Sequence, residues 1–446
     1  MWSPTPFCSA ATGGRALEPP HDTGTVMGMK LAPLESVWTQ DAPRHSAAPP
    51  RTIANYVAWP IALLIVIHRV FVSAWTGALT DDFTTVWSAA KRFVDREPVY
   101  NETYHHVDPH YLYNPGATLL LSPLGLAPSI DVARPLFILA NAAAIIIALA
   151  WLTRRSGFAL SHPVFPFLIA AAFLTESVTY TLVFSNINGV LLLALVAFLD
   201  WFVRGHSWAA GLVLGFAIVI KPMFAPLLVL PLMRLDFKAP LAAVAVPVVL
   251  NLIAWPLTPG ASDYVDKVMP YLGITRDYAN ASLAGFAAYY GMPNWLHALL
   301  FLLIAAAVAV AIIGLARFRY SDAWMWAATS SGVLISGVCL LSSLGQAYYS
   351  MMLLPAILTV VRPVSPMHVA PVWVGIVIFY SPLQWAESNF PDLGANLDIV
   401  LVTIAWTIFI ISIAAWVVSV STTAKETAND PEQLPRLDRG AMARQA

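Results

Sequence analysis

The sequence predicts an all-α membrane protein that crosses the bilayer many times. Its 446 residues are 58% hydrophobic and 11% charged, and their mean hydropathy is +0.68. A single water-soluble core cannot hide this much apolar surface. The chain also contains many apolar runs near the length of about 20 residues that a helix needs to cross a bilayer. Its two cysteines, Cys8 and Cys339, are too few for a disulfide framework or a thiolate metal site.

Ten apolar runs predict spanning helices, and two further runs are interrupted by proline. The interrupted runs, 116–128 with Pro123 and 208–233 with Lys221-Pro222, are interpreted as re-entrant hairpins. About ten to twelve transmembrane or re-entrant helices are therefore expected. The predicted spans are 53–78, 131–152, 163–184, 188–203, 240–257, 295–316, 323–342, 349–361, 368–384 and 399–421.

The two ends of the chain are polar. Residues 1–51 are rich in Pro, Gly, Ser and Ala, which predicts a disordered cytoplasmic tail before an uncleaved first span. Residues 52–421 are predicted to form the membrane domain, and 422–446 a second cytoplasmic tail. The expected outer loops are 79–115, 258–294 and 385–398.

The distribution of Lys and Arg predicts the orientation of the membrane domain. With the N-terminus in the cytoplasm, the inner loops and tails hold 16 of the 24 basic residues, the outer side receives 6, and Arg69 and Lys221 lie within membrane segments. Cytoplasmic loops are enriched in Lys and Arg, so this asymmetry favours cytoplasmic termini and outer loops that face away from the cell interior.

Two adjacent carboxylates, Asp81 and Asp82, follow the first predicted span and are expected on the outer side. Like charges this close raise each other's proton affinity, so one of them is a candidate general base while the other orients it or binds substrate. The sequence does not distinguish the two. The alternative is that both are ordinary solvated charges of a polar loop. An amphipathic stretch at 86–93 is expected to lie in the membrane interface beside them.

The same outer loop holds three histidines, His105, His106 and His110. They have no helical i, i+4 spacing with a partner acid, so we predict interfacial or substrate contacts and no metal. No cofactor is predicted. Asp108 and Tyr113 of this loop are further candidates for sugar or acceptor contacts.

Ionisable residues also occur inside predicted membrane segments. A charge near the bilayer centre costs about 2.5–3.5 kcal/mol on insertion scales, so such residues usually face a cavity or a partner. Glu176 is a candidate sugar contact, and Lys221 at the hairpin tip is a candidate to neutralise a lipid-linked phosphate. The alternative is a structural pair between them. Arg276 and Arg69 are the other candidate phosphate ligands.

Polar and aromatic side chains cluster at the predicted outer ends of several spans. Amides suit sugar hydroxyls, and tyrosine rings offer stacking faces to sugar rings. An aromatic belt at the interface is the alternative interpretation of the tyrosines. The candidates for sugar and acceptor binding in these clusters are Asn186, Asn188, Asp277, Tyr278, Gln346, Tyr348 and Tyr349.

Several of these residues fall in motifs that run in a fixed order. The motifs resemble those of the mycobacterial-type membrane α-(1→3)-arabinofuranosyltransferases, family 87 of the GT-C class of polyprenyl-phosphate-sugar-dependent glycosyltransferases. The resemblance covers roughly residues 52–421, and Asn114 departs from it by replacing a second proline. The motifs are "DDF" (81–83), "VDPHYLY" (107–113), "TLVFSNING" (181–189), "KP" (221–222), "TRDY" (275–278), "YYG.P.WL" (289–296) and "YYSMM" (348–352).

This resemblance implies a fold, a location and a reaction. It implies a GT-C fold in the plasma membrane with its catalytic face on the outer side. The donor would be decaprenylphosphoryl-arabinose, and the acceptor a growing arabinan of cell-envelope arabinogalactan or lipoarabinomannan, which gains α-(1→3) branches. It also implies an aspartate base at the end of the first span, which falls on Asp81 or Asp82. No nucleic-acid partner is implied.

The expected mechanism combines the base with the cations. A carboxylate takes the proton of an acceptor 3-hydroxyl, and the oxygen attacks the anomeric carbon while the lipid phosphate leaves from the opposite face. Cations stabilise the departing phosphate. Two alternatives stay open at this point: a mannosyltransferase that uses polyprenyl-phosphate-mannose, and a polytopic transporter or lipid flippase.

Overall fold

The computed structural model describes residues 50–75, 81–104, 110–382, 385 and 390–429, and every regular element in these ranges is a helix. The predicted all-α class is therefore confirmed for this part of the chain. Most of both predicted tails, 1–49 and 430–446, lies outside the described residues.

Within the described ranges, six helices are long and apolar enough to cross a membrane. Two of them continue into a short non-α segment: α2 (Pro50–Ile67) into η1 (His68–Ala74), and α14 (Asn294–Leu315) into η5 (Ala316–Phe318). The other four are α5 (Ile130–Arg155), α11 (Lys238–Leu257), α15 (Ala323–Leu341) and the stretch Val400–Val420 of α18 (Pro391–Asn429).

The remaining predicted spans are bent or short. The run 163–184 forms α6 (Val164–Leu174) and α7 (Glu176–Val183), which meet at 66° and count as a seventh span only if the pair is taken as one. A helix of 16 residues is about 24 Å long, below the roughly 30 Å of a hydrocarbon core. The short apolar helices at predicted spans are α8 (Asn188–Val203), the segment η6 (Ala347–Leu353), α16 (Leu354–Ile357), η7 (Leu358–Val361), and α17 (Ala370–Tyr380).

Both runs that proline interrupts are broken helices. The first consists of α4 (Pro115–Leu121) and η2 (Ser122–Leu126), which begins next to Pro123. The second consists of α9 (Ser207–Ile220), η3 (Pro222–Leu228) and α10 (Val229–Met233). Between its halves Lys221 is extended, with φ −135° and ψ 103°, because a residue before proline is pushed out of the helical region.

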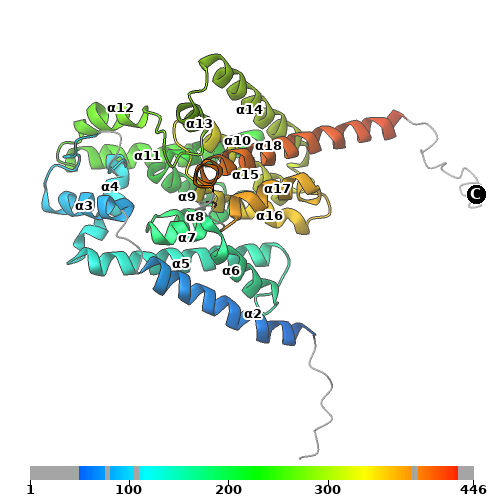
Figure 1. Cartoon of the computed structure of the whole chain (residues 1–446), viewed down its shortest axis with the longest axis horizontal. Coiled ribbons are helices and arrows are strands. Elements are labelled where there is room, and N and C mark those ends of the chain that lie inside the picture. Colours follow the sequence, from blue (N-terminus) through cyan, green and yellow to red (C-terminus); the bar gives the residue numbers. More distant parts are fainter. Residues whose placement is uncertain (1–49, 76–80, 105–109, 383–384, 386–389, 430–446) are drawn as a thin grey trace, which may run out of the picture. The chain divides into compact units, whose positions relative to one another are not determined.

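The core is built around α15, which is almost entirely buried and packs against α8, α14, α16 and α18. Its middle is a run of small residues, Thr329 to Gly332, which lets neighbouring helices approach closely. Figure 1 shows this bundle, in which α2 packs along α6 and α5 along α8. The remaining helices are α3 (Asp81–Asp95), η4 (Tyr264–Val268), α12 (Met269–Leu272), α13 (Leu283–Tyr290) and η8 (Pro366–His368).

The predicted amphipathic stretch forms part of α3, which packs on η2 through a glycine. A Cβ at Gly125 would lie 2.4 Å from the backbone oxygen of Ala90. Replacing Gly125 with Val is therefore expected to destabilise the protein by about 1–3 kcal/mol through overpacking. Thermal unfolding in detergent measures this loss, with Gly273→Ala as control, because its added Cβ meets one near atom, at 3.3 Å. Equal unfolding temperatures for the two variants would contradict this packing.

Candidate active site

A cavity of about 630 Å³ lies where six separate parts of the chain meet. They are the start of α3, the segment 110–114, the turn after α7, the break between α9 and η3, the region around α12, and the stretch 338–349 that leads into η6. Nine of the residues predicted from the sequence line this one cavity: Asp82, His110, Tyr113, Asn186, Lys221, Arg276, Gln346, Tyr348 and Tyr349.

An amide connects a carboxylate and a cation in this cavity. The Asn186 Nδ2 donates to Asp82 Oδ2 at 3.0 Å, and the Lys221 Nζ donates to Asn186 Oδ1 at 2.9 Å. The turn that carries Asn186 is set by Ser185, whose φ of 48° is left-handed and ends α7. Asn186 thus fixes one oxygen of Asp82 and leaves its other oxygen available for chemistry in the cavity.

Lys221 is held by acceptors on three sides. Besides Asn186, its Nζ donates to Asn188 Oδ1 at 2.7 Å and to the Tyr349 hydroxyl at 3.4 Å. It also lies 4.6 Å from the ring centroid of Tyr349 and 5.6 Å from that of Tyr348. An ammonium has three N–H donors, so these partners occupy all of them. Lys221 therefore acts on the cavity mainly through its charge.

Arg276 is placed differently from Lys221. Its guanidinium lies between two rings, 5.7 Å from the centroid of Tyr271 and 5.9 Å from that of Tyr278. Within the described residues its side chain forms no ion pair. A guanidinium that lines a cavity without an ion-pair partner can offer its N–H donors to an incoming anion. Of the three predicted phosphate ligands, Arg276 is thus the one best placed for direct contact.

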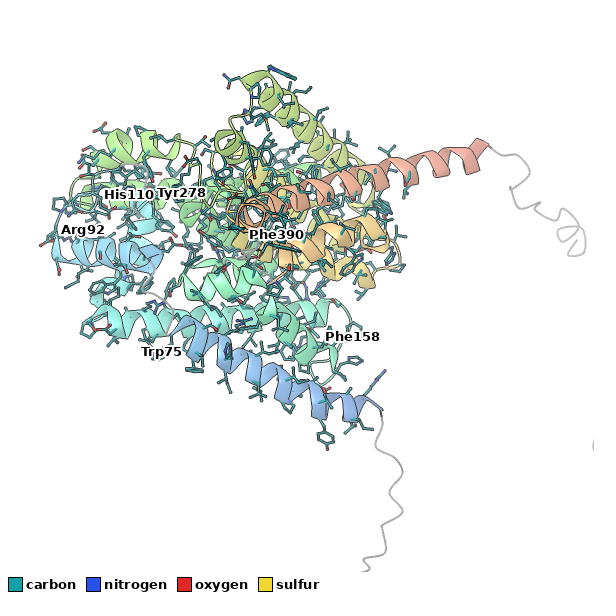
Figure 2. The ribbon with its side chains drawn as sticks, viewed as in Figure 1. Trp75, Arg92, His110, Phe158, Tyr278 and Phe390 are labelled. Carbon is teal, nitrogen blue, oxygen red and sulfur yellow. The ribbon has the colours of Figure 1, made fainter. Side chains whose placement is uncertain are left out.

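Glu102 anchors the segment 110–114 at the cavity. Its carboxylate accepts from the backbone N–H of Tyr111 at 3.1 Å and from Arg92 at 3.4 Å. The oxygen that accepts from Tyr111, Oε2, also lies 3.2 Å from His110 Nδ1, whereas Arg92 donates to Oε1. Figure 2 shows Arg92, His110 and Tyr278 on the same side of the membrane domain. This anchoring fixes the backbone on which His110 and Tyr113 reach the cavity.

Tyr113 stays a neutral hydrogen-bond donor at the cavity wall. Burial raises the pKa of its phenol, and the neighbouring Tyr349 and Asp82 raise that pKa further. A neutral phenol beside a carboxylate suits a polar, uncharged ligand such as a sugar hydroxyl.

The other predicted site residues lie away from the cavity lining or outside the description. Arg69, in η1, donates through Nε to the Phe173 oxygen at 3.3 Å. Glu176 begins α7. Asn188 is buried behind Lys221, whereas Asp277 and Tyr278 are exposed. Asp81 begins α3, but its side chain lies outside the described part of the chain, as do Asp108, His105 and His106.

The structure adds cavity residues that sequence reasoning missed. Asn114 donates through Nδ2 to the Val219 oxygen at 2.7 Å and caps α4 by accepting from the Ala117 N–H at 3.0 Å. An Asn-Pro pair before an apolar run is a helix-start signal that could have identified this cap. Cys339 also lines the cavity, and nothing in its apolar surroundings signals it.

No group of three or more His, Cys, Asp or Glu side chains that could hold a metal is found among the residues that the structure describes. His105, His106 and Asp108 lie outside these residues.

Fold and cavity together define a polytopic helical membrane protein with a polar, cation-bearing site at the ends of its helices. Residues 111–343 match glycosyltransferase family 87, more than half of the chain, and the chain belongs to this family. It is therefore an enzyme, a glycosyltransferase, rather than the transporter or flippase considered above. The family resemblance inferred from the ordered motifs is confirmed.

Relatives that carry one shared name match most of the chain. An α-(1→3)-arabinofuranosyltransferase of Corynebacterium glutamicum is 51% identical over 375 residues, which is 83% of this chain and 90% of that protein. Proteins of the same name from Mycolicibacterium smegmatis and Mycobacterium tuberculosis are 43% and 42% identical, over 83% of this chain and 86% of each relative.

Proposed function

We propose that the enzyme transfers D-arabinofuranose from decaprenylphosphoryl-arabinose to an arabinan acceptor of the cell envelope and forms α-(1→3) branches. The observation that carries this proposal is the name shared by relatives that are 42–51% identical over most of the chain. The cavity supports it, because it joins a carboxylate, hydroxyl-binding amides and phenols, and an arginine in one space.

Asp82 is the general base in this proposal. Its carboxylate accepts the proton of the acceptor 3-hydroxyl, and that oxygen forms a new bond to the anomeric carbon. The bond from the anomeric carbon to the phosphate oxygen breaks on the opposite face, so the configuration inverts. The lipid monophosphate leaves with the bonding electrons. The hydrogen bond from Asn186 supports this role by holding the carboxylate in its acceptor orientation.

Arg276 stabilises the leaving phosphate by direct contact, and Lys221 contributes a fixed positive charge nearby. Negative charge grows on the phosphate as the bond breaks, and pre-placed cations in a poorly solvated site lower the energy of that state. Arg69 is less suited to this role than predicted, because it is not part of the cavity lining. Asn186, His110, Tyr113, Gln346, Tyr348 and Tyr349 are positioned to contact sugar hydroxyls and rings.

The location of the cavity follows from the nature of the donor. The polyprenyl chain stays in the lipid, so the phosphate and sugar must reach a cavity at the membrane surface. The 16-to-6 asymmetry of basic residues supports cytoplasmic termini and an outer active site in the plasma membrane. In this proposal the ten to twelve membrane helices predicted from the sequence consist of the six long spans together with the short and broken helices.

Accessibility labelling tests this orientation. In a Cys8→Ser background, Asp277→Cys is expected to react with an impermeant maleimide in whole cells, because Asp277 is exposed near the cavity. Arg317→Cys is the matched control, because Arg317 is exposed in η5, which continues α14, and it is expected to react only after permeabilisation. Labelling of Arg317→Cys in intact cells, with protection of Asp277→Cys, would reverse the proposed orientation.

A cell-free transfer assay tests the activity. Purified protein is supplied with decaprenylphosphoryl-arabinose or with polyprenylphosphoryl-mannose and an arabinan oligosaccharide, and the linkage of the product is analysed. We expect arabinose transfer and a (1→3) linkage. Transfer of mannose alone would establish the mannosyltransferase alternative instead.

A further inference from the structure

A second polar cavity, of about 550 Å³, lies at the end of α8 that is remote from the active-site cavity, and the two share no lining residue. The first residue of α8, Asn188, bonds Lys221, whereas the last turns of α5 and α8 form the second cavity. A helix of 16 residues is about 24 Å long, so the cavities are well separated. In Figure 2 the loop after α5, marked by Phe158, likewise lies far from His110.

The second cavity carries uncompensated positive charge. Asp200 is buried and forms ion pairs with two arginines, with Arg155 Nε at 3.0 Å and Arg204 Nε at 2.9 Å. Arg154, on the same turn as Arg155, is exposed and forms no ion pair within the described residues. Three arginines face one carboxylate, which leaves two positive charges in the cavity. A charged cluster of this kind attracts an anion.

The residues that line this cavity are of the kinds found at a membrane interface. Trp151 and Trp201 line it and meet edge to face at 6.0 Å, and tryptophan is enriched at the level of lipid headgroups. The three arginines stand at the ends of two apolar helices, one of them a full span. An adjoining cavity of about 430 Å³ shares Trp201 and adds Lys238. Positive charge and an apolar rim at the end of a span suit an anion that has acyl chains.

We propose that the cavity between the ends of α5 and α8 binds the phosphate headgroup of an anionic phospholipid. Arg154 and Arg204 contact the phosphate, and Trp151 and Trp201 face the glycerol and the start of the acyl chains. The occupant is a lipid of the leaflet opposite the active site, not the sugar donor. Both cavities would bind a phosphate group, but they lie at opposite ends of α8. One lipid therefore cannot occupy both.

Native mass spectrometry of the full-length protein tests the proposal. The protein is released from nanodiscs that contain equal amounts of phosphatidylglycerol and phosphatidylcholine, and the lipids it retains are counted. We expect preferential retention of phosphatidylglycerol. A basic residue near an anionic lipid contributes enough for about a fivefold change in affinity, so Arg154→Gln should lower retention about fivefold and Arg154→Gln/Arg204→Gln further.

The single variant keeps both ion pairs of Asp200, so it tests lipid binding without disturbing the buried carboxylate. Arg317→Gln removes an exposed arginine from η5, at the end of another span, and should retain the lipid fully. Equal retention of both lipids by the unmodified protein, or an equal loss in Arg317→Gln, would overturn the proposal. So would displacement of the lipid by millimolar inorganic phosphate, because the site would then bind free anions.

Discussion

Replacing Asp82 with Asn is expected to lower the rate of sugar transfer about 10²- to 10⁴-fold, the usual contribution of a positioned general base. An amide cannot take the proton of the acceptor hydroxyl, but its oxygen still accepts the hydrogen bond from Asn186, so the cavity should keep its shape. The measurement is kcat with saturating donor and acceptor, on protein that elutes and unfolds like the original.

Asp81→Asn is the matched control for this experiment. It removes one carboxylate from the same turn of α3 and is expected to keep most of the activity. If Asp81→Asn abolishes transfer while Asp82→Asn keeps it, the base is Asp81, and the hydrogen bond from Asn186 has only a structural role. The pair of variants therefore resolves the choice that the sequence left open.

Replacing Arg276 with Gln is expected to lower kcat about 10²- to 10³-fold, the range seen when a donor to developing charge is removed. The donors of Lys221 are occupied by two amides and a phenol, whereas the Arg276 guanidinium lies against two rings, so the leaving phosphate depends most on Arg276. The Michaelis constant for the donor should also rise, because the phosphate is present in the ground state. The Michaelis constant for the acceptor should stay nearly unchanged, which separates phosphate binding from general damage.

Two further variants act as comparisons for Arg276. Lys221→Met should lower kcat less, by about tenfold. The lysine acts through Asn186 and through its charge, and it does not contact the phosphate directly. Arg69→Gln should have little effect, because Arg69 bonds a backbone oxygen outside the cavity. A larger loss for Arg69→Gln than for Arg276→Gln would show that the phosphate lies elsewhere.

The helical class and the long spans could be predicted from the sequence, because hydropathy over about 20 residues is a strong signal in a membrane protein. The bounds of α5, α11, α14 and α15 lie within a few residues of the predicted runs. The bend in the run 163–184 could not be predicted. Thr175 caps a new helix in the middle of this apolar stretch, and the two helices meet at 66°. Hydropathy does not detect such a cap.

Many of the residues that line the cavity could be predicted from the sequence, but their hydrogen-bond partners could not. Their positions at predicted outer span ends placed Asp82, Asn186 and Tyr349 on the same side, and the structure brings them together in one cavity. The bond network was not predictable, because a side chain's partner depends on where separate helices meet. Lys221 illustrates this: it was predicted as a phosphate ligand, yet two amides and a phenol occupy its donors.

A structure with a bound donor analogue tests whether Arg276 binds the phosphate and Asp82 faces the anomeric carbon. The analogue is an arabinofuranosyl lipid in which a methylene group replaces the bridging phosphate oxygen, so that it binds but cannot react. We expect its phosphonate at hydrogen-bond distance from Arg276, about 2.7–3.2 Å, with the anomeric carbon open to attack from the side of Asp82. A phosphonate bound by Arg154 and Arg204, or an anomeric carbon that faces away from Asp82, would contradict it.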